Sequence, residues 1–488
     1  MNQDLTPIRN QPVCFNCVGD EYVSSLIETD GKKRACSECS EDLNTLLLSE
    51  IATIVDRGFQ EHFQRTASEP NGYEYMMLKD KELDYDWYRE GEAANDLIAY
   101  ELSVSQEIAD KLHLLLADEY SDFDAAIIGE ETEYGDEVLY EEKAVSDNGL
   151  YWEWQQFERT VLNEARFFSE GAKEFLDGIF ANLKELETRD GKPILQVINP
   201  QDTPLSFYRG RVFHHDKNIE KALERPDINI GPPPSNLAGA GRMNPKNISV
   251  FYGATHPKIA LSELRPPVGS TVVMGEFEVV RPLKLLNLKR LQRVFTSGSV
   301  FDPQYSVILG KTHFLKSLVT IMTRPTNPNN SDAEYLPTQL IADYLANANS
   351  ASVDGILYPS SQTKKSGMNV VLFRRASKVE EISIPEGTEM TTRMWEEHED
   401  GADRSYSVVE WIPSTCPDED QEDDNSDDVF GFALPKYFGH DLDGRDVTLR
   451  VKKDALHVHI IEATKIKTDK YQVRRNRYEK RESGSVLF

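Results

Sequence analysis

The chain has 488 residues and a formal net charge of −29, and 39% of its residues are hydrophobic. This length predicts two to four domains, and the charge disfavours general attraction to nucleic acid or anionic membranes. No run approaches the roughly 18 apolar residues of a membrane-spanning helix, and the first residues lack the features of a secretion signal. We therefore expect a cytoplasmic, multidomain protein with reduced thiols and no membrane contact.

Four of the five cysteines form two close pairs near the start of the chain. Cys14 and Cys17 form one C-x2-C pair, and Cys36 and Cys39 form the second after an 18-residue spacer. This spacing is typical of a four-thiolate zinc site, in which each pair supplies one edge of a tetrahedron. We expect a structural zinc ion and a zinc-binding module over residues 1–42; chance spacing or redox pairs are the alternatives.

Apolar residues recur at three- and four-residue intervals between residues 43 and 194. This period is typical of amphipathic helices. The clearest examples are Leu43, Leu46, Leu47, Ile51, Ile54 and Val55, then Leu97, Leu102, Ile108, Leu112 and Leu115, and then Trp154, Phe157, Val161, Leu162, Phe167 and Phe168. Polar and acidic connections separate these stretches, so we expect an α-helical bundle over residues 43–194.

Glycine and proline clusters begin after Arg189, and short strand-like stretches follow. These stretches are residues 206–212, 249–252, 272–280, 370–373 and the alternating segment 456–460. We expect an α/β domain over residues 195–376 and a mixed α/β extension over 377–488. The extension contains an acidic run between Asp418 and Asp428 that is typical of a solvated linker.

Polar and aromatic residues that suit an anionic, sugar-bearing ligand recur through the α/β region. They are Tyr208-Arg209, Gly241-Arg242-Met243-Asn244-Pro245, Phe251-Tyr252-Gly253-Ala254, Ala260-Leu261-Ser262-Glu263, Tyr358-Pro359-Ser360 and Gly367-x-Asn369. This ordered series resembles the RES domain, a family named after arginine, glutamate and serine. The cysteine pairs and helical region before it look like the HEPN-type region that accompanies some RES domains.

The resemblance implies a fold related to ADP-ribosyltransferases and an activity that releases nicotinamide from NAD, by phosphorolysis or hydrolysis. It also implies a toxin or defence effector, with an antitoxin or regulatory protein as a partner. The catalytic residues that it implies are Arg209, Glu263 and Ser360. The substrate-binding residues that it implies are Arg242, Tyr252 and Tyr208.

The chemistry of NAD is consistent with these residues. Guanidinium groups bind pyrophosphate through paired N–H donors, so Arg209 and Arg242 are expected to form a clamp. Loss of nicotinamide builds positive charge on the ribose, and the carboxylate of Glu263 would stabilise that charge. Tyr252 offers an aromatic face to the leaving ring. Inorganic phosphate is the expected second substrate, and this mechanism requires no metal.

Each of these residues also has a purely structural interpretation. Glu263 and Arg242 would then be surface charges, Tyr252 a core residue and Ser360 part of a turn. The occurrence of all of them in family order favours the functional interpretation.

Arg57 and His62 support a second functional hypothesis, because they satisfy the R-x4-H pattern of HEPN ribonucleases. An arginine and a histidine about one helical turn apart could hold a phosphate and move a proton. Gly58 between them costs the helix about 1 kcal/mol relative to alanine, and the acidic surroundings repel RNA. The alternative function is therefore a metal-independent ribonuclease, with the RES-like region as a nucleotide-binding module.

The end of the chain from Lys465 to Arg481 is strongly basic, opposite to the overall charge. A solvated tail is one interpretation, and a contact for RNA or a protein partner is the other. In a third, non-enzymatic hypothesis, the zinc and helical regions form a partner-binding module with this tail as a contact. A homo-oligomer is also left open.

Overall fold

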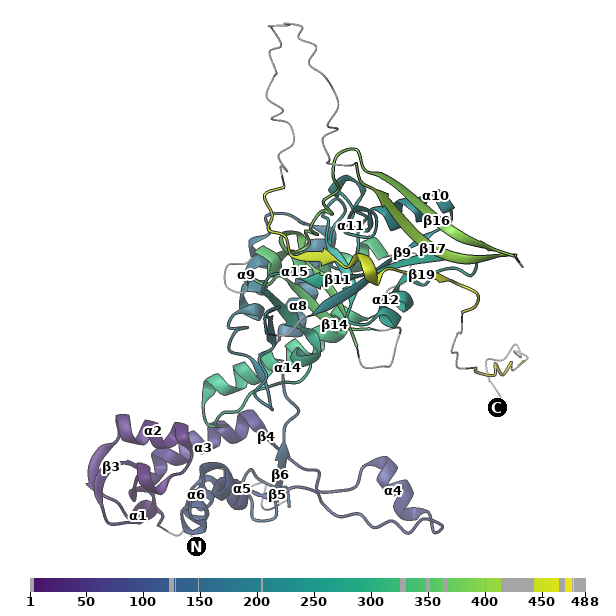
Figure 1. The fold of residues 1–488 in the computed structure, drawn as a ribbon. Coiled ribbons are helices and arrows are strands. Elements are labelled where there is room, and N and C mark those ends of the chain that lie inside the picture. The colour runs from purple at the N-terminus through teal and green to yellow at the C-terminus, as the bar shows by residue number, and fades with distance from the viewer. Residues whose placement is uncertain are drawn as a thin grey trace, which may run out of the picture.

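The computed structural model forms an N-terminal module and a larger α/β body, which meet near the start of helix α14 (Figure 1). It describes residues 4–122, 127, 129–147, 149–202, 205–324, 331–347, 352–360, 362, 367–399, 401–413, 443–464, 470–475 and 477. The acidic run 418–428 and most of the basic end 465–481 lie outside the described residues.

The N-terminal module combines helices with two small antiparallel sheets, ordered β1-β3-β2 and β4-β6-β5. Its helices are α1 (Thr6–Arg9), α2 (Glu21–Asp30), α3 (Leu48–His62), α4 (Gly72–Lys79), α5 (Ala94–Leu102) and α6 (Gln106–Glu119). Its strands are β1 (Pro12–Cys14), β2 (Lys32–Ala35), β3 (Asp42–Leu47), β4 (Phe63–Arg65), β5 (Glu92–Ala93) and β6 (Leu139–Glu142). The apolar faces of α3, α5 and α6 meet in one core.

The expectation of an all-helical bundle over residues 43–194 is wrong in two respects. Strands β3 to β6 lie among the helices; β4, β5 and β6 have only three, two and four residues, and the six residues of β3 do not alternate between apolar and polar. The last two helices, α8 (Leu150–Asn163) and α9 (Glu170–Phe180), pack in the core of the larger body instead. An apolar period identifies a helix, but it does not say which core the helix joins.

The larger body contains the remaining elements. Its other helices are α10 (Asp216–Glu224), α11 (Pro226–Asn229), α12 (Pro257–Leu264), α13 (Leu288–Leu291), α14 (Pro303–Thr323) and α15 (Ser331–Asn347). Its strands are β7 (Glu187–Thr188), β8 (Leu195–Ile198), β9 (Ser206–Phe213), β10 (Phe251–Ala254), β11 (Thr271–Val279), β12 (Leu283–Asn287), β13 (Val294–Phe295), β14 (Gly355–Pro359), β15 (Met368–Leu372), β16 (Glu389–His398), β17 (Gly401–Trp411), β18 (Leu449–Val451) and β19 (His457–Ile460). The strands expected from the sequence correspond to β9, β10, β11, β15 and β19.

A nine-stranded mixed sheet organises this body. The strand order is β18-β11-β9-β10-β15-β14-β12-β8, and β19 also pairs with β11. The pair β12 and β14 is parallel, and the other pairs in this sheet are antiparallel. Helices α8, α9, α14 and α15 cover one face, and α12 covers another part of that same face. Helix α10 and the β16–β17 hairpin pack over the opposite face.

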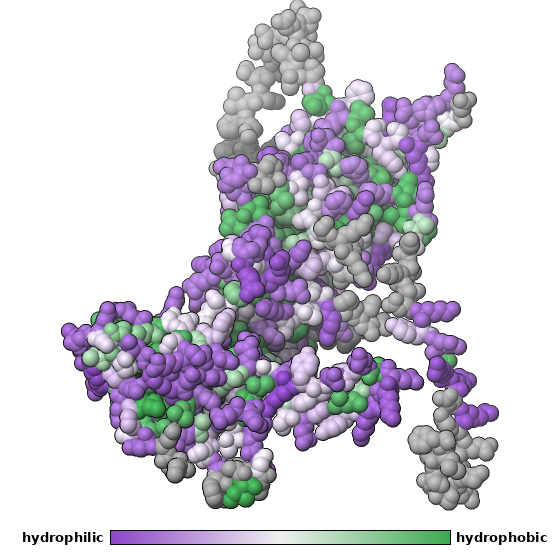
Figure 2. Space-filling view, turned by 90° about the horizontal axis from the view of Figure 1, so that it is seen from below, coloured by the Kyte–Doolittle hydropathy of each residue, from purple (hydrophilic) through white to green (hydrophobic). Residues whose placement is uncertain are grey.

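Hydrophilic residues dominate the face shown in Figure 2, with small apolar patches between them. Within the described ranges, no helix is long and apolar enough to cross a membrane.

Candidate active site

Glu263 lies at the centre of a small polar cluster on one face of the sheet. Ser360 Oγ donates a hydrogen bond to Glu263 Oε1 at 2.6 Å, and Asn369 Nδ2 donates to the same oxygen at 2.9 Å. Glu263 is exposed, Ser360 is half-buried and Asn369 is buried. Both donors reach one carboxylate oxygen, so they orient the carboxylate and leave Oε2 free of these two bonds.

Three segments that are distant in sequence form this cluster. Glu263 lies in the last turn of α12, Ser360 follows β14 directly, and Asn369 lies in β15 opposite Tyr358. Tyr358 and Asn369 are opposed on adjacent antiparallel strands, so their side chains point to the same face, and Ser360 follows two residues after Tyr358. The sheet therefore directs Ser360 and Asn369 toward α12, the helix that carries Glu263.

The segment before Asn369 holds α12 against β15. The Thr255 amide donates to the Met368 carbonyl at 2.8 Å, and the Met368 amide donates to Thr255 Oγ1 at 2.9 Å. At Gly367 a Cβ atom would overlap the Cδ1 atom of Ile259 in the first turn of α12. Glycine therefore permits the close approach that brings Glu263 to Asn369.

Tyr252 organises the loop that carries Arg242. Tyr252 Oη donates to Asn244 Oδ1 at 2.8 Å and accepts from the Met243 amide at 2.9 Å. Asn244 Nδ2 in turn donates to three carbonyl groups within residues 239–248. At Gly241 a Cβ atom would lie 2.6 Å from Asn244 Oδ1 and 2.8 Å from Tyr252 Oη. The glycine, the asparagine and the tyrosine thus fix one loop conformation.

Arg242 extends from this loop to the end of α14. Its Nη1 and Nη2 atoms donate to the carbonyls of Met322 at 2.9 Å and Arg324 at 2.7 Å. The guanidinium carbon lies 5.4 Å from the ring centroid of Tyr335 in α15. Arg242 therefore caps the C-terminal carbonyls of one helix and stacks on another, as a cation suits such a position.

Electrostatic interactions place these groups in one neighbourhood. Burial raises the pKa of Tyr358, Tyr252 and Glu263 raise it further, and Arg242 opposes the shift. Burial also raises the pKa of Tyr252. Both phenols are therefore neutral hydrogen-bonding groups at physiological pH. The structure brings together Glu263, Ser360, Tyr252 and Arg242, four of the residues that the sequence singles out.

Arg209 has a different environment. Its Nε atom donates to the Ile230 carbonyl at 2.8 Å, and its Nη1 atom donates to the Tyr252 carbonyl at 2.6 Å. Its guanidinium carbon lies 5.6 Å from the Phe251 ring centroid. Burial lowers the pKa of Arg209 to about 9, and Arg211 adds to the shift. In this structure Arg209 therefore joins the backbone at Ile230 to the backbone of β10 through its two hydrogen bonds.

The pleat of the sheet separates Arg209 from the carboxylate cluster. Tyr208 is opposite Ala254, and Ala254 is opposite Asn369, so these three side chains share one face. Arg209 follows Tyr208 and points to the other face. The structure therefore does not bring Arg209 together with Glu263 and Ser360. A pyrophosphate clamp of Arg209 and Arg242 stays a prediction, since both guanidinium groups here have backbone carbonyl partners.

Tyr208 lies on the face of Glu263, near the C-terminal extension. Burial raises its pKa, and the neighbouring Glu276 carboxylate adds to the shift through its charge and a hydrogen bond. Glu276 also pairs with Lys452 at 2.6 Å. Lys452 lies in the extension and belongs to none of the sequence motifs.

Asn369 does belong to a motif, because it ends Gly367-x-Asn369. Its hydrogen bond to Glu263, however, depends on the fold and cannot be read from the motif.

Residues 211–395 match the family model of the RES domain. The chain therefore contains a RES domain, a domain associated with NAD-degrading toxins. No curated protein and no solved structure matches the chain. The match begins after Tyr208 and Arg209 and extends beyond the expected end at residue 376 into strand β16. Glu263, Ser360, Asn369, Tyr252 and Arg242 all lie within it.

The four cysteines before the RES domain form one cluster. Cys14 Sγ lies 3.6 Å from both Cys17 Sγ and Cys39 Sγ, and Cys36 Sγ lies 3.9 Å from Cys17 Sγ. All four sulfur atoms lie within 4.8 Å of one another. Tetrahedral zinc with Zn–S bonds of about 2.3 Å would separate its sulfur ligands by about 3.8 Å. The four cysteines therefore fit a tetrahedral metal such as zinc, as their spacing predicts, and could supply all four of its ligands.

The Arg57 and His62 motif contacts the RES domain instead of an open cleft. Arg57 Nη2 donates to the Phe301 carbonyl at 3.1 Å, and the His62 ring lies 5.8 Å from that of Tyr305 at the start of α14. His62 Nε2 is buried without a hydrogen-bond partner, and burial lowers its pKa. The HEPN resemblance is not supported, and both motif residues have structural positions at the junction.

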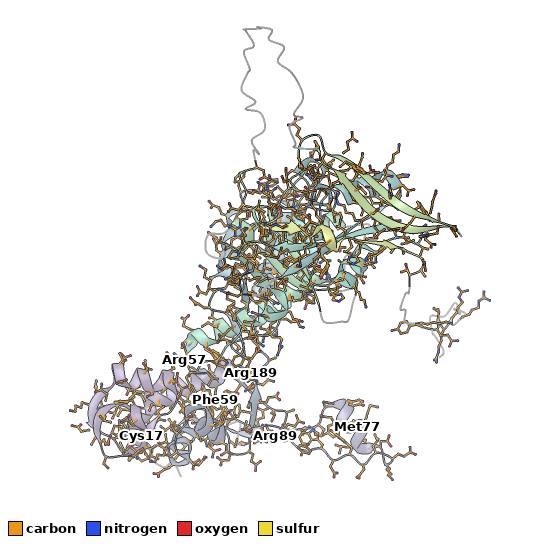
Figure 3. All side chains as sticks on the ribbon, viewed as in Figure 1. Cys17, Arg57, Phe59, Met77, Arg89 and Arg189 are labelled. Carbon is orange, nitrogen blue, oxygen red and sulfur yellow. The ribbon has the colours of Figure 1, made fainter. Side chains whose placement is uncertain are left out.

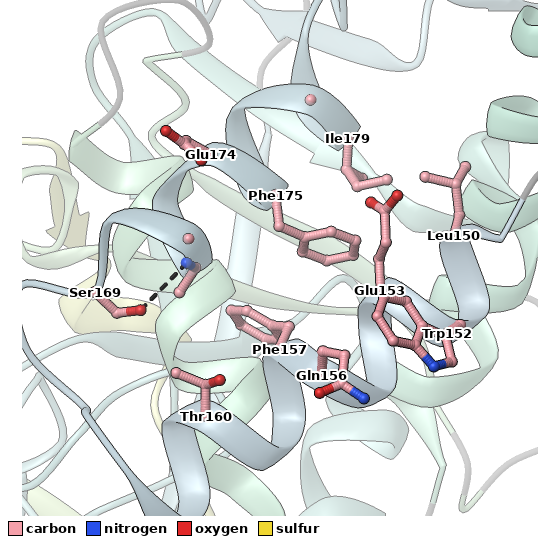
Figure 4. Close-up of a pocket in the computed structure, with 13 residues that line it drawn as sticks. Leu150, Trp152, Glu153, Gln156, Phe157, Thr160, Ser169, Glu174, Phe175 and Ile179 are labelled. Atoms are coloured by element: carbon pink, nitrogen blue, oxygen red, sulfur yellow. Dashed lines mark hydrogen bonds between the residues drawn. The ribbon is translucent and has the colours of Figure 1, made fainter.

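An apolar cleft of about 410 Å³ lies between α8 and α9. The rings of Phe157 and Phe175 stack in it at 5.4 Å, and Trp152 stands at its edge (Figure 4). The residues that line this cleft include none of those singled out in the RES domain. Its aromatic lining fits the packing role of α8 and α9 beside α14.

Proposed function

We propose that the RES domain cleaves the bond between nicotinamide and ribose in NAD, with inorganic phosphate as the acceptor. The observation that supports this best is the Glu263 carboxylate, which is exposed to a ligand yet oriented by Ser360 and Asn369. A fixed carboxylate at an accessible position is the group that a cationic sugar requires.

The proposed reaction begins with departure of nicotinamide. The C1′–N bond breaks, its electron pair neutralises the pyridinium nitrogen, and positive charge develops on C1′ and the ring oxygen of the ribose. Glu263 would stabilise this charge, because a carboxylate held in place needs no reorganisation when the charge forms. A phosphate oxygen then bonds to this same anomeric carbon and gives ADP-ribose with a phosphate at the position that nicotinamide has left.

The neighbouring residues would bind the two ends of the substrate. Tyr252 and Tyr208 are proposed to contact the nicotinamide ribose and its leaving ring, as their neutral phenols can stack and hydrogen-bond. Arg242 is proposed to bind the pyrophosphate. It would have to exchange its α14 carbonyl partners for phosphate oxygens, which guanidinium groups bind more strongly.

The biological role proposed is that of a toxin or defence effector whose NAD consumption is restrained by a partner protein. Zinc in the cysteine cluster would then stabilise the N-terminal module and take no part in the reaction. Arg57 and His62 contact the start of α14 and therefore do not support the ribonuclease alternative.

The test is NAD consumption by the purified full chain, with and without phosphate, followed by mass identification of the products. Wild-type protein should yield nicotinamide and ADP-ribose phosphate only when phosphate is present. Free ADP-ribose would instead make the activity a hydrolysis. Replacing Glu263 by glutamine should lower kcat/KM by on the order of 10²–10³-fold.

Glu380→Gln is the matched control, because Glu380 is a carboxylate of the RES domain that pairs with Arg450 and has no role in the proposed reaction. It should retain most of the turnover. Equal turnover by wild type and Glu263→Gln would remove the proposed role of Glu263.

A further inference from the structure

Helix α14 connects the N-terminal module to the candidate active site. It runs from Pro303 to Thr323, and its 21 residues span roughly 30 Å at about 1.5 Å per residue. Its two ends have different partners. Residues just before its start are bound by the N-terminal module, and the carbonyls at its end are bound by Arg242.

The start of α14 is fastened into the N-terminal core. Phe301 is 1% exposed and belongs to that core. Its ring packs on Gly58 of α3, where a Cβ atom would lie 2.7 Å from Phe301 Cδ1. The Phe301 carbonyl accepts from Arg57, which Figure 3 places where the module meets the larger body. Gly58, a costly residue within a helix, thus makes room for Phe301.

A second bond holds the same segment. Ser299 Oγ donates to Asp20 Oδ1 at 3.0 Å, and Asp20 caps the N-terminus of α2 by accepting from the Val23 amide. The segment before α14 is therefore tied to α2 and α3, the two helices that flank the cysteine cluster and the first sheet. A shift of these helices has to move the start of α14 or break these contacts.

From Gly310 onward α14 is packed in the core of the larger body, whereas Val307 and Ile308 before it are exposed. Its buried residues are Gly310, Thr312, Phe314, Leu315, Leu318, Val319 and Met322. A helix packed in this way moves as one body, because a close-packed core does not deform continuously. A displacement at its first turn is therefore expressed at its last turn.

The end of α14 meets the loop that Tyr252 organises. Arg242 binds the last carbonyls of the helix, while Thr338 Oγ1 and Gln339 Nε2 of α15 donate to the carbonyls of Arg242 and Gly241 at 2.8 and 2.7 Å. The position of Arg242 therefore depends on both helices.

We propose that Phe301 is a positioning residue for the NAD site: it sets the register of α14, and α14 sets the guanidinium of Arg242. This inference rests on the proposed function for its kinetic consequence. The N-terminal module would thereby control substrate binding through one buried aromatic ring, without contributing a group to the site.

The experiment compares Phe301→Ala with Leu112→Ala in the full chain. Leu112 is fully buried in the same core but belongs to α6, so its truncation leaves a cavity without touching α14. Two readouts are taken at a temperature where both variants remain folded. They are the separate kcat and KM for NAD, and hydrogen exchange at the Met243 amide, which donates to Tyr252 Oη.

Phe301→Ala should raise KM by roughly 2-fold to 30-fold, the size of effects along coupled elements, with a smaller change in kcat. It should also speed exchange at Met243, and Phe301→Leu should restore part of both. Leu112→Ala should leave both near wild type. Equal effects of Phe301→Ala and Leu112→Ala, or none at Met243, would overturn the proposal.

Arg57→Gln provides a variant that removes only the bond to the Phe301 carbonyl from an exposed side chain. It should change KM and Met243 exchange in the same direction, by less than Phe301→Ala. Absence of NAD turnover in the wild type would refute the proposed function alone, since the exchange readout tests the link through α14 without any substrate.

Discussion

The N-terminal module and the RES domain place their polar groups in opposite ways. In the module, four cysteine sulfur atoms face one another within 4.8 Å and leave no ligand position among themselves for a substrate. In the RES domain, Glu263 receives two hydrogen bonds on one oxygen and remains exposed. A closed set of donors suits a structural role, and an oriented but accessible group suits chemistry.

The largest expected effect follows from opening the closed cluster. Cys36→Ser, or treatment with a strong chelator, should unfold the N-terminal module. Zinc binding contributes about 10–16 kcal/mol in small structural sites, as much as the total stability of a typical domain, about 5–15 kcal/mol. Calorimetry of the wild type should show an unfolding transition of the N-terminal module, and this transition should be missing after Cys36→Ser or chelation. Cys416→Ser, at the fifth cysteine, should leave that transition in place.

The next effect concerns activity in the RES domain. Asn369→Asp replaces the buried donor to Glu263 by a second carboxylate, which repels Glu263 at neutral pH and can donate a hydrogen bond to it only after taking up a proton at lower pH. The lost bond to a charged group is worth about 1.5–3 kcal/mol, so NAD turnover at neutral pH should fall about 10-fold to 100-fold. Turnover should recover as the pH falls. If the pH profile of NAD turnover were unchanged from wild type, Asn369 would not influence Glu263.

A smaller effect is expected at the junction. Gly58→Ala should raise helix propensity by about 1 kcal/mol, but its Cβ atom would meet Phe301 at 2.7 Å. Overpacking costs about 1–3 kcal/mol, so we expect net destabilisation in urea unfolding. Gly178→Ala in α9 is the matched control, because a Cβ atom there meets no atom within 4 Å and should stabilise the protein. Stabilisation by both variants would show that the module does not hold Phe301 tightly.

The smallest effect is a pH dependence of stability from His62. Burial lowers its pKa, Lys143 adds to the shift, and Glu61 and Glu142 oppose it. The unfolded chain therefore binds the proton more readily, so this contribution is present above pH of about 6.5 and is lost as the pH falls. The slope of unfolding free energy against pH between 7.5 and 5.5 should be shallower in His62→Phe. An identical slope in the two proteins would mean that the His62 side chain is solvent-exposed in the folded protein.

The cysteine cluster could be predicted from sequence because its spacing is local: each pair lies on one turn. The Glu263 cluster could be predicted only as a set of residues in family order. Its geometry depends on Gly367, whose missing side chain seats α12, and on the register that places Asn369 opposite Tyr358. Neither the close approach at Gly367 nor this strand register can be read from the sequence alone.

The roles of the arginines are the least predictable from the sequence. A guanidinium can bind either pyrophosphate or backbone carbonyls, because both offer oxygen acceptors. The sequence cannot say that Arg209 lies beneath β10 or that Arg242 meets the end of α14. The same limit applies to Arg57, whose spacing from His62 resembles a catalytic motif although both residues contact the start of α14.

The shared packing of α8 and α9 with α14 and α15 decides how this protein can be cut into pieces for expression. Trp154, Phe157 and Ile179 are buried against Phe314 and Leu318. A truncated protein that starts at residue 195 would expose that apolar surface to water and would be prone to aggregate. The shortest soluble fragment that keeps Glu263 and Ser360 should therefore begin before Leu150. Phe301, left without its pocket in that fragment, is the first residue to replace by a polar one.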